Sequence, residues 1–159
     1  MASTDDRTGG GGFRTLVYFA QFFFGGWFVL HGLNHWMHFF PQPPGSSPLA
    51  AELIGALIHS GLFTLVKAME VVTGLMMLAN RLVPLAIVLA TPIGISIAFM
   101  DHTANPDWYG TLTAATIMLF LAIMALGYVR SFLPLFVFNQ GEPNAGALKT
   151  LLGSAGKEG

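Results

Sequence analysis

The chain has no cysteine among its 159 residues. Disulfides, thiolate metal ligands and thiol–disulfide chemistry are therefore excluded for it. Charge is scarce as well, since only 9% of the residues are Asp, Glu, Lys or Arg, against about 25% in a soluble domain. Seven residues are basic and the formal net charge is −1, so we do not expect nucleic acid as a partner.

Apolar residues are abundant instead. They make up 53% of the chain, and the mean hydropathy is +0.63. This composition indicates an integral membrane protein with room for about four spans of roughly 20 residues each. Residues 1–12 hold two aspartates and four glycines and lack the basic region and cleavage site of a signal peptide. We expect these residues to form a flexible leader. We also expect the first hydrophobic helix to stay in the protein and not to be removed by a signal peptidase.

The predicted fold class is all-α, an integral membrane four-helix bundle. Hydrophobic runs place its spans at about residues 13–40, 61–79, 82–100 and 112–128. A proline-rich stretch ends the first span, and residues 49–60 are expected to form a short interfacial segment before the second. The membrane domain thus covers 13–138, and a flexible tail follows at 139–159. Gly25 and Gly26 mark where a neighbouring helix can approach closely.

Basic residues predict the orientation in the membrane. The loops after the first and third spans contain no Lys or Arg. With four spans, the positive-inside rule places both termini in the cytoplasm and these two loops outside. All basic residues except Lys67 agree: Arg7, Arg14, Arg81, Arg130, Lys149 and Lys157.

Lys67 and Glu70 stand inside an otherwise apolar run. They are three residues apart, so on a helix they share one face. A charge at membrane depth costs roughly 2.5–3.5 kcal/mol even on the lenient insertion scale. We therefore expect the two to face the bundle interior and to pair, either as a structural clamp or as part of a ligand site.

Polar residues recur near the predicted outer side. His31, Asn34, His35 and His38 follow the spacing i, i+3, i+4, i+7 of one helix stripe. His59 would continue the stripe of Lys67 and Glu70 if its helix runs on into the second span. His102 ends the third span. Together these residues predict an outward-facing pocket in which His35, His102 and Asn34 contact a ligand and Glu70 forms the floor.

Three chemistries could use such a pocket. Haem would need two imidazoles at similar depth, with His35 and either His102 or His59 as candidates. A metal could be held by His31, His35 and His38, although no carboxylate shares their stripe. An apolar molecule with a polar head group, such as a quinone, fits the combination of histidines with an aromatic-lined cleft better. We expect no tightly held metal, no covalently bound cofactor, and a quinone or a lipid as ligand.

Several stretches of the chain form a recognisable set: Gly32-Leu33-Asn34-His35, Leu65-Val66-Lys67-Ala68-Met69-Glu70, Gly74-Leu75, Asn80-Arg81-Leu82-Val83-Pro84-Leu85-Ala86, Pro92 and His102. Together they resemble the DoxX family of small bacterial membrane proteins. The similarity covers about residues 15–130 and is most specific between Lys67 and Ala86. His31, His38 and His59 are not part of the motif.

The resemblance implies a four-helix membrane protein of the bacterial inner membrane. Some members of the family are membrane subunits of a thiosulfate:quinone oxidoreductase, and others assemble with redox enzymes. It implies a non-catalytic accessory or quinone-facing subunit, with membrane lipids and other membrane subunits as partners. The alternative is a purely structural subunit that fills a helix–lipid interface. A small transporter is less favoured, because the first and third spans share no proline or charge pattern.

Overall fold

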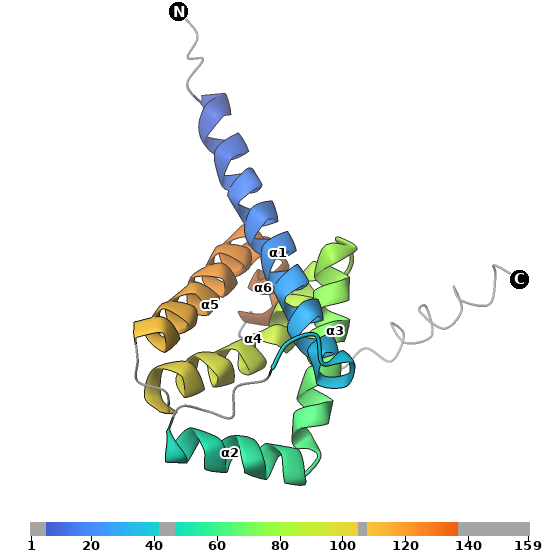
Figure 1. Cartoon of the computed structure of the whole chain (residues 1–159). Coiled ribbons are helices and arrows are strands. Elements are labelled where there is room, and N and C mark those ends of the chain that lie inside the picture. Colours follow the sequence, from blue (N-terminus) through green and yellow to red (C-terminus); the bar gives the residue numbers. More distant parts are fainter. Residues whose placement is uncertain (1–5, 42–46, 105–107, 137–159) are drawn as a thin grey trace, which may run out of the picture.

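The computed structural model describes residues 6–41, 47–104 and 108–136, and the regular structure in these ranges is entirely helical (Figure 1). This confirms the predicted all-α class. The five longer helices are α1 (Asp6–Met37), α2 (Pro48–His59), α3 (Leu62–Leu78), α4 (Val83–Phe99) and α5 (Trp108–Gly127). The short elements are a π-helical turn η1 (Met100–Ala104), α6 (Val129–Phe132) and a 3-10 turn η2 (Leu133–Phe136).

Three helical segments in the described ranges are long and apolar enough to cross a membrane: Gly11–Met37, Val83–His102 and Trp108–Gly127. α3 has 17 residues, about 26 Å of helix, which is slightly less than the roughly 30 Å of a hydrocarbon core. Together with α2 it makes a fourth candidate span, bent by 85°. Large apolar side chains on these helices are exposed, as expected for surfaces that face lipid. The chain therefore has the helices of a multi-pass membrane protein.

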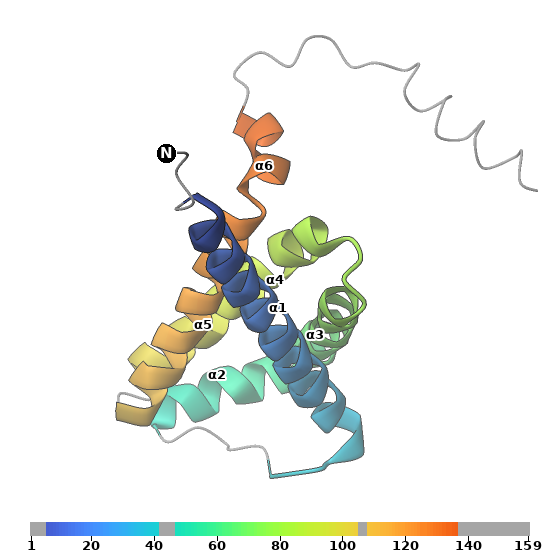
Figure 2. The same ribbon diagram turned by 90° about the horizontal axis from the view of Figure 1, so that it is seen from above.

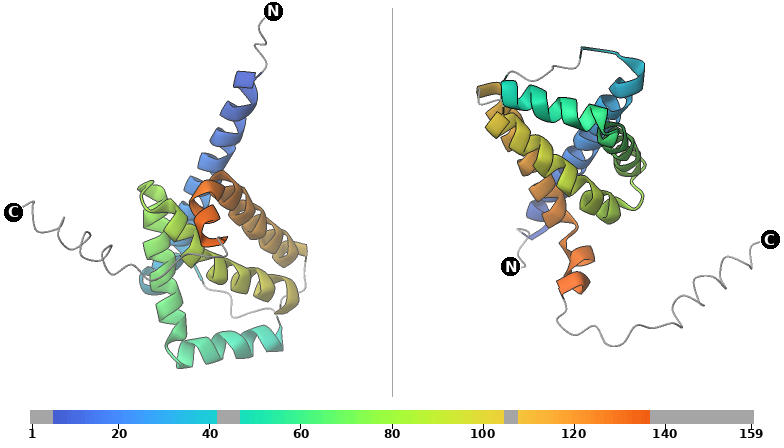
Figure 3. Two further views of the ribbon diagram at one scale, coloured as in Figure 1. Left: turned by 180° about the vertical axis from the view of Figure 1, so that it is seen from behind. Right: turned by 90° about the horizontal axis from the view of Figure 1, so that it is seen from below.

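Four helices surround the core. α1 packs against α3 and α5, and α4 packs against the same two helices. α1 and α4 run toward the end of the molecule at which α2 lies, whereas α3 and α5 run away from it (Figure 1). Seen from below, α2 lies across this end, between the start of α3 and the junction of α4 with α5 (Figure 3). Phe24, Phe28, Met77 and Met124 are among the buried side chains at the centre.

Tight packing of α1 on α3 depends on glycine. A Cβ atom on Gly74 would lie 2.6 Å from the carbonyl oxygen of Gly25, and one on Gly32 would lie 2.9 Å from the carbonyl oxygen of Lys67. No side chain larger than hydrogen fits at these distances. The predicted close approach at Gly25 is present, whereas Gly26 faces open space. Seen from above, α1 crosses α3 along this seam (Figure 2).

α1 begins earlier than predicted. Its helix starts at Asp6, inside the segment expected to be a flexible leader, and its first turns project beyond the other helices (Figure 1). Glycine disfavours helix, but extending an existing helix by one residue costs far less than starting one. The long apolar helix therefore continues through the glycine run. The hydroxyl of Thr15 adds a hydrogen bond to the carbonyl of Gly11 at 3.0 Å.

α1 also ends earlier than predicted, at Met37 and not at Phe40. His38 takes a left-handed conformation, with φ of 53°, and its backbone N–H donates to the carbonyl of Asn34 at 3.0 Å. This is the helix-ending αL motif. Pro41 contributes, because a proline disfavours the helical conformation of the residue before it. His38 consequently lies off the stripe on which its spacing had placed it.

A break separates α2 from α3. Gly61 has a φ of 77°, a conformation that glycine adopts without a steric penalty. The axes of the two helices differ by 85°. His59 is the last residue of α2 and does not continue the stripe of Lys67 and Glu70, contrary to the arrangement considered from the sequence.

The remaining boundaries lie close to the prediction. α3 ends in a Schellman motif, in which Asn80 is left-handed and the N–H of Arg81 donates to the carbonyl of Met76 at 3.0 Å. α4 starts one residue later than predicted, and α5 starts at Trp108 and not at residue 112. The predicted tail, 139–159, lies outside the described residues.

Candidate functional site

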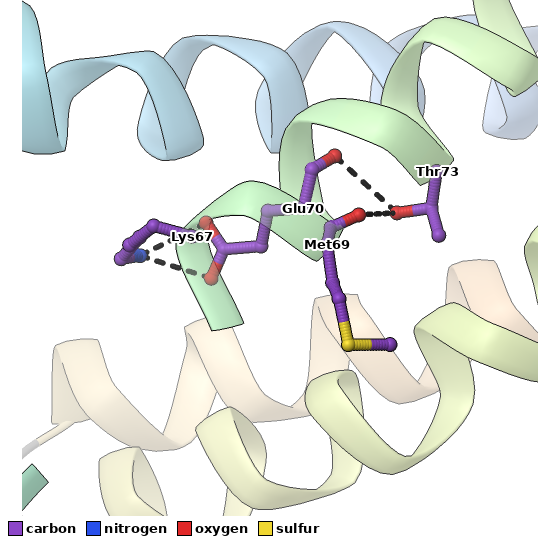
Figure 4. A network of polar contacts seen from close by, with 4 residues as sticks. All are labelled: Lys67, Met69, Glu70 and Thr73. Carbon is purple, nitrogen blue, oxygen red and sulfur yellow. Dashed lines mark hydrogen bonds and ion pairs between the residues drawn. The ribbon is translucent and has the colours of Figure 1, made fainter. Parts of the chain in front are cut away.

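Lys67 and Glu70 form the pair that their spacing predicts. The ammonium nitrogen of Lys67 donates to both carboxylate oxygens of Glu70, at 2.9 Å each. The Glu70 side chain is 1% exposed and that of Lys67 11%. Figure 4 shows the side-chain nitrogen of Lys67 facing the carboxylate of Glu70. Both charges are thus neutralised inside the protein, as membrane depth requires.

The surroundings hold this pair in place. The hydroxyl of Thr73 donates to the carbonyl of Met69 at 2.7 Å and lies 3.3 Å from that of Glu70, which fixes the turn below the carboxylate (Figure 4). On the other side, the Lys67 nitrogen lies 5.2 Å from the centre of the Phe63 ring, within the range of a cation–π contact.

His35 reaches the same group of residues from α1. Its ring packs edge-on against Phe63, with 5.4 Å between ring centres, and its Nε2 shares a 3.0 Å hydrogen bond with the hydroxyl of Thr64. Gly32, one turn earlier, allows the backbones of α1 and α3 to meet beside Lys67. Phe63 thus contacts both the His35 ring and the Lys67 ammonium, and it connects His35 with the Lys67–Glu70 pair.

Asn34 has another role than the predicted ligand contact. It is 0% exposed. Its amide nitrogen donates to the carbonyl of Phe40 at 3.0 Å, and its amide oxygen accepts from the N–H of Phe40 at 2.9 Å. These two bonds hold the chain beyond the end of α1 in place. Asn34 therefore positions Phe40, and its predicted contact with a ligand stays a prediction.

His102 lies apart from His35. It is exposed in η1, and its Nδ1 shares a 3.3 Å hydrogen bond with the hydroxyl of Thr111 on α5. α2 contacts both η1 and α3, and it lies between the two regions (Figure 3). His35 has its contacts on α3 and His102 has its contact on α5, so the structure does not bring them into contact as a haem-ligating pair. A shared pocket for both stays a prediction.

His31, which no motif assigned, lies at the end of an aromatic ladder. Phe19, Phe23, Trp27 and His31 repeat every four residues along α1, and each ring contacts the next. The His31 ring stacks on Trp27 with 4.3 Å between centres and an angle of 20°. The ring of Phe40 meets its other side at 5.1 Å. Sequence reasoning placed His31 on a polar stripe and missed this ladder, although its four-residue repeat is visible in the sequence.

A groove runs beside this ladder, between α1 and α5. Its volume is about 180 Å³. Apart from two threonines its walls are apolar: Phe23, Phe24, Trp27, Leu112, Thr113, Thr116, Ile117 and Phe120. The Thr113 hydroxyl donates to the carbonyl of Tyr109 and the Thr116 hydroxyl to that of Leu112. Both hydroxyl donors are therefore occupied within α5, and the groove suits an apolar chain.

Sequence reasoning missed a buried polar network centred on Gln21, which is 0% exposed. Its amide nitrogen donates to the carbonyl of Met77 at 2.8 Å and to the side-chain oxygen of Asn80 at 3.0 Å. The hydroxyl of Tyr128 donates to its amide oxygen at 2.6 Å. The network joins α1, the end of α3 and the end of α5. A lone glutamine in an apolar run was the available signal.

The histidines do not assemble a metal centre of the kind considered from the sequence. His38 lies outside the helix, so it no longer shares a stripe with His31 and His35. Across residues 6–41, 47–104 and 108–136, no three His, Cys, Asp or Glu side chains form a group that could hold a metal ion.

Comparison with protein-family models, with curated proteins and with solved structures finds no match to this chain. Its resemblance to the DoxX family therefore stays a prediction. The geometry of the site is the remaining basis for a function. It consists of an internally neutralised ion pair, His35 in contact with Phe63 beside that pair, and an apolar groove whose wall residue Trp27 stacks on His31.

Proposed function

We propose that this chain is a four-span protein of the bacterial inner membrane that serves as an accessory, quinone-facing subunit of a redox-linked membrane complex. The observation that carries the proposal is that His35 meets the Lys67–Glu70 pair where α1 packs on α3, with His31 one turn earlier on α1 beside the groove residue Trp27. Polar groups at membrane depth are costly and mark sites of function by default. Imidazoles next to an apolar groove can bind a carbonyl head group and leave its tail in lipid.

The arrangement of helices supports the topology in this proposal. The start of α1, the α3–α4 turn and α6 carry Arg14, Arg81 and Arg130, respectively. α1 and α4 run in one direction and α3 and α5 in the other (Figure 1), which suits four crossings with both termini on one side. By the positive-inside rule that side is the cytoplasm. The histidines and α2 then lie toward the outer face.

A role as a purely structural subunit is the second candidate. The observation that favours it is that Lys67 and Glu70 neutralise each other's charge through two hydrogen bonds, as a packing clamp would. In that case the chain would assemble with other membrane subunits but would bind no quinone.

Partner capture tests the role as an accessory subunit. The tagged chain is cross-linked in its native membranes, solubilised in a mild detergent and purified, and its partners are identified by mass spectrometry. The proposal expects a subunit that carries flavin, haem or an iron–sulfur cluster, enriched over an equally tagged, unrelated multi-pass protein. Recovery of the chain with lipids alone, or with partners that hold no redox group, would contradict the redox assignment.

A further inference from the structure

We propose that His31 and the groove between α1 and α5 form one binding site for a neutral, carbonyl-headed amphiphile of the quinone class. The tail lies in the groove, and the head accepts a hydrogen bond from the His31 ring. This inference rests on the proposed function and names the site at which it would be carried out.

Trp27 connects the groove with His31. Trp27 lines the groove, and its indole stacks on the His31 ring with 4.3 Å between centres. A molecule whose tail follows the groove past Trp27 therefore meets the imidazole next. His31 lies six residues before the end of α1, about 9 Å along the helix axis. A head group bound there lies about two turns inside the end of α1.

His31 has unused hydrogen-bonding capacity. The ring is partly buried, and its ring contacts with described residues are the stacking on Trp27 and the edge of Phe40. No described residue forms a hydrogen bond with it. His35, by contrast, already shares a bond with Thr64. A neutral imidazole always offers one N–H donor and one acceptor, so His31 can bind a head group without losing an internal partner.

Charge selects a neutral head group. A phospholipid phosphate needs cationic partners with free donors. Lys67 faces the residue after His31, since a Cβ atom on Gly32 would lie 2.9 Å from the Lys67 carbonyl oxygen. Its ammonium donates to both oxygens of Glu70, which uses two of its three N–H donors. The positive charge is thereby balanced by a carboxylate, which would repel an anionic head group. A quinone carbonyl needs only one donor, and the aromatic walls of the groove suit an isoprenoid tail.

Phe40 and Asn34 complete the site. The two hydrogen bonds between the Asn34 amide and the backbone of Phe40 hold the Phe40 ring against His31. The imidazole is thereby kept between Trp27 and Phe40. Asn34 is a positioning residue in this arrangement and does not contact the ligand.

Tryptophan fluorescence tests the site directly, because Trp27 is one of three tryptophans in the chain. Replacing Trp36 and Trp108 with phenylalanine leaves Trp27 as the only indole. The protein is reconstituted in phosphatidylcholine nanodiscs and titrated with a decyl-tailed dimethoxybenzoquinone. A variant that keeps only Trp108 reports collisional quenching by quinone dissolved in the bilayer.

We expect saturable quenching of Trp27 and linear quenching of Trp108. His31→Phe, which keeps a ring on Trp27 but removes the donor, should raise the midpoint about tenfold. His31→Gln, which restores an N–H donor, should recover most of that loss. Thr116→Phe, which fills the groove, should abolish saturation, and so should replacing the probe with the tail-less benzoquinone. His38→Phe, at an exposed histidine outside the helix, should change nothing.

Linear quenching of both tryptophans would overturn the site, and so would an unchanged midpoint in His31→Phe. Quenching of Trp27 by a brominated phosphatidylcholine that the quinone cannot displace would make the groove a lipid site only. If His31→Phe fails to elute as a single species, the comparison of tailed and tail-less probes on the otherwise native chain still decides. A purified chain that carries quinone but shows no saturable quenching would refute this site and leave the proposed function standing.

Discussion

The ammonium of Lys67 lies 2.9 Å from each carboxylate oxygen of Glu70, one turn along the same buried face of α3. Each charge is therefore balanced by the other inside the protein. We predict that Glu70→Gln destabilises the protein by about 3–5 kcal/mol, because it leaves the Lys67 charge buried and uncompensated. The double variant Lys67→Met/Glu70→Leu should lose less. Unfolding by SDS titration in mixed micelles measures both.

Glu52→Gln is the matched control for this series, because Glu52 is an exposed carboxylate on α2. It should leave the free energy of unfolding within about 0.5 kcal/mol of the native value. A Glu70→Gln variant as stable as Glu52→Gln would show that the pair is no clamp.

The contact between α1 and α3 yields a second prediction. Gly74→Ala would place its Cβ 2.6 Å from the backbone oxygen of Gly25, so the helices must separate. We expect a loss of about 1–3 kcal/mol, typical of overpacking. Gly26→Ala is the control, since nothing lies within 4 Å of its added Cβ. Equal thermal stability of the two variants in detergent would contradict the observed seam.

The Gln21 network predicts an effect far from the histidines. Tyr128→Phe removes the donor to the Gln21 amide oxygen and leaves that buried oxygen unsatisfied, at a cost of about 1–3 kcal/mol. Tyr109→Phe, at a tyrosine that is 62% exposed, should be neutral. The SDS titration distinguishes the two. If Tyr128→Phe were neutral as well, Gln21 would not connect α5 to α1 in the membrane.

Orientation can be tested cleanly because the chain has no cysteine. Single cysteines introduced at Glu52 and at Arg81 lie at opposite ends of the helices. In intact cells an impermeant maleimide should label the cysteine at position 52, and should label the one at position 81 only after permeabilisation. The reverse pattern would invert the topology and place the histidines on the cytoplasmic side.

The sequence was sufficient for the all-α class and for the central pair. Hydrophobic runs located α2, α3, α4 and α5 to within four residues at each end, whereas α1 begins seven residues earlier than predicted. The spacing of Lys67 and Glu70 identified their contact. The close helix approach predicted at Gly25 is confirmed, because close packing requires the absence of a side chain at a helix crossing.

What the sequence could not provide was the direction of the chain at two junctions. Gly61 turns α2 away from α3, and His38 ends α1, so two histidines left the stripes on which simple helical spacing had placed them. The roles of Asn34 and Gln21 depend on backbone groups brought close by tertiary structure. Side-chain spacing along one helix carries no information about such partners.

The quinone content of the purified chain decides between a quinone-facing and a purely structural subunit. Protein extracted from its native membranes in a mild detergent is separated from free lipid, and its isoprenoid quinones are extracted and quantified against protein. Our account predicts quinone near one molecule per chain in the native protein and a marked loss in Thr116→Phe. A content no higher than in an unrelated multi-pass protein purified in parallel would contradict it and favour the purely structural subunit.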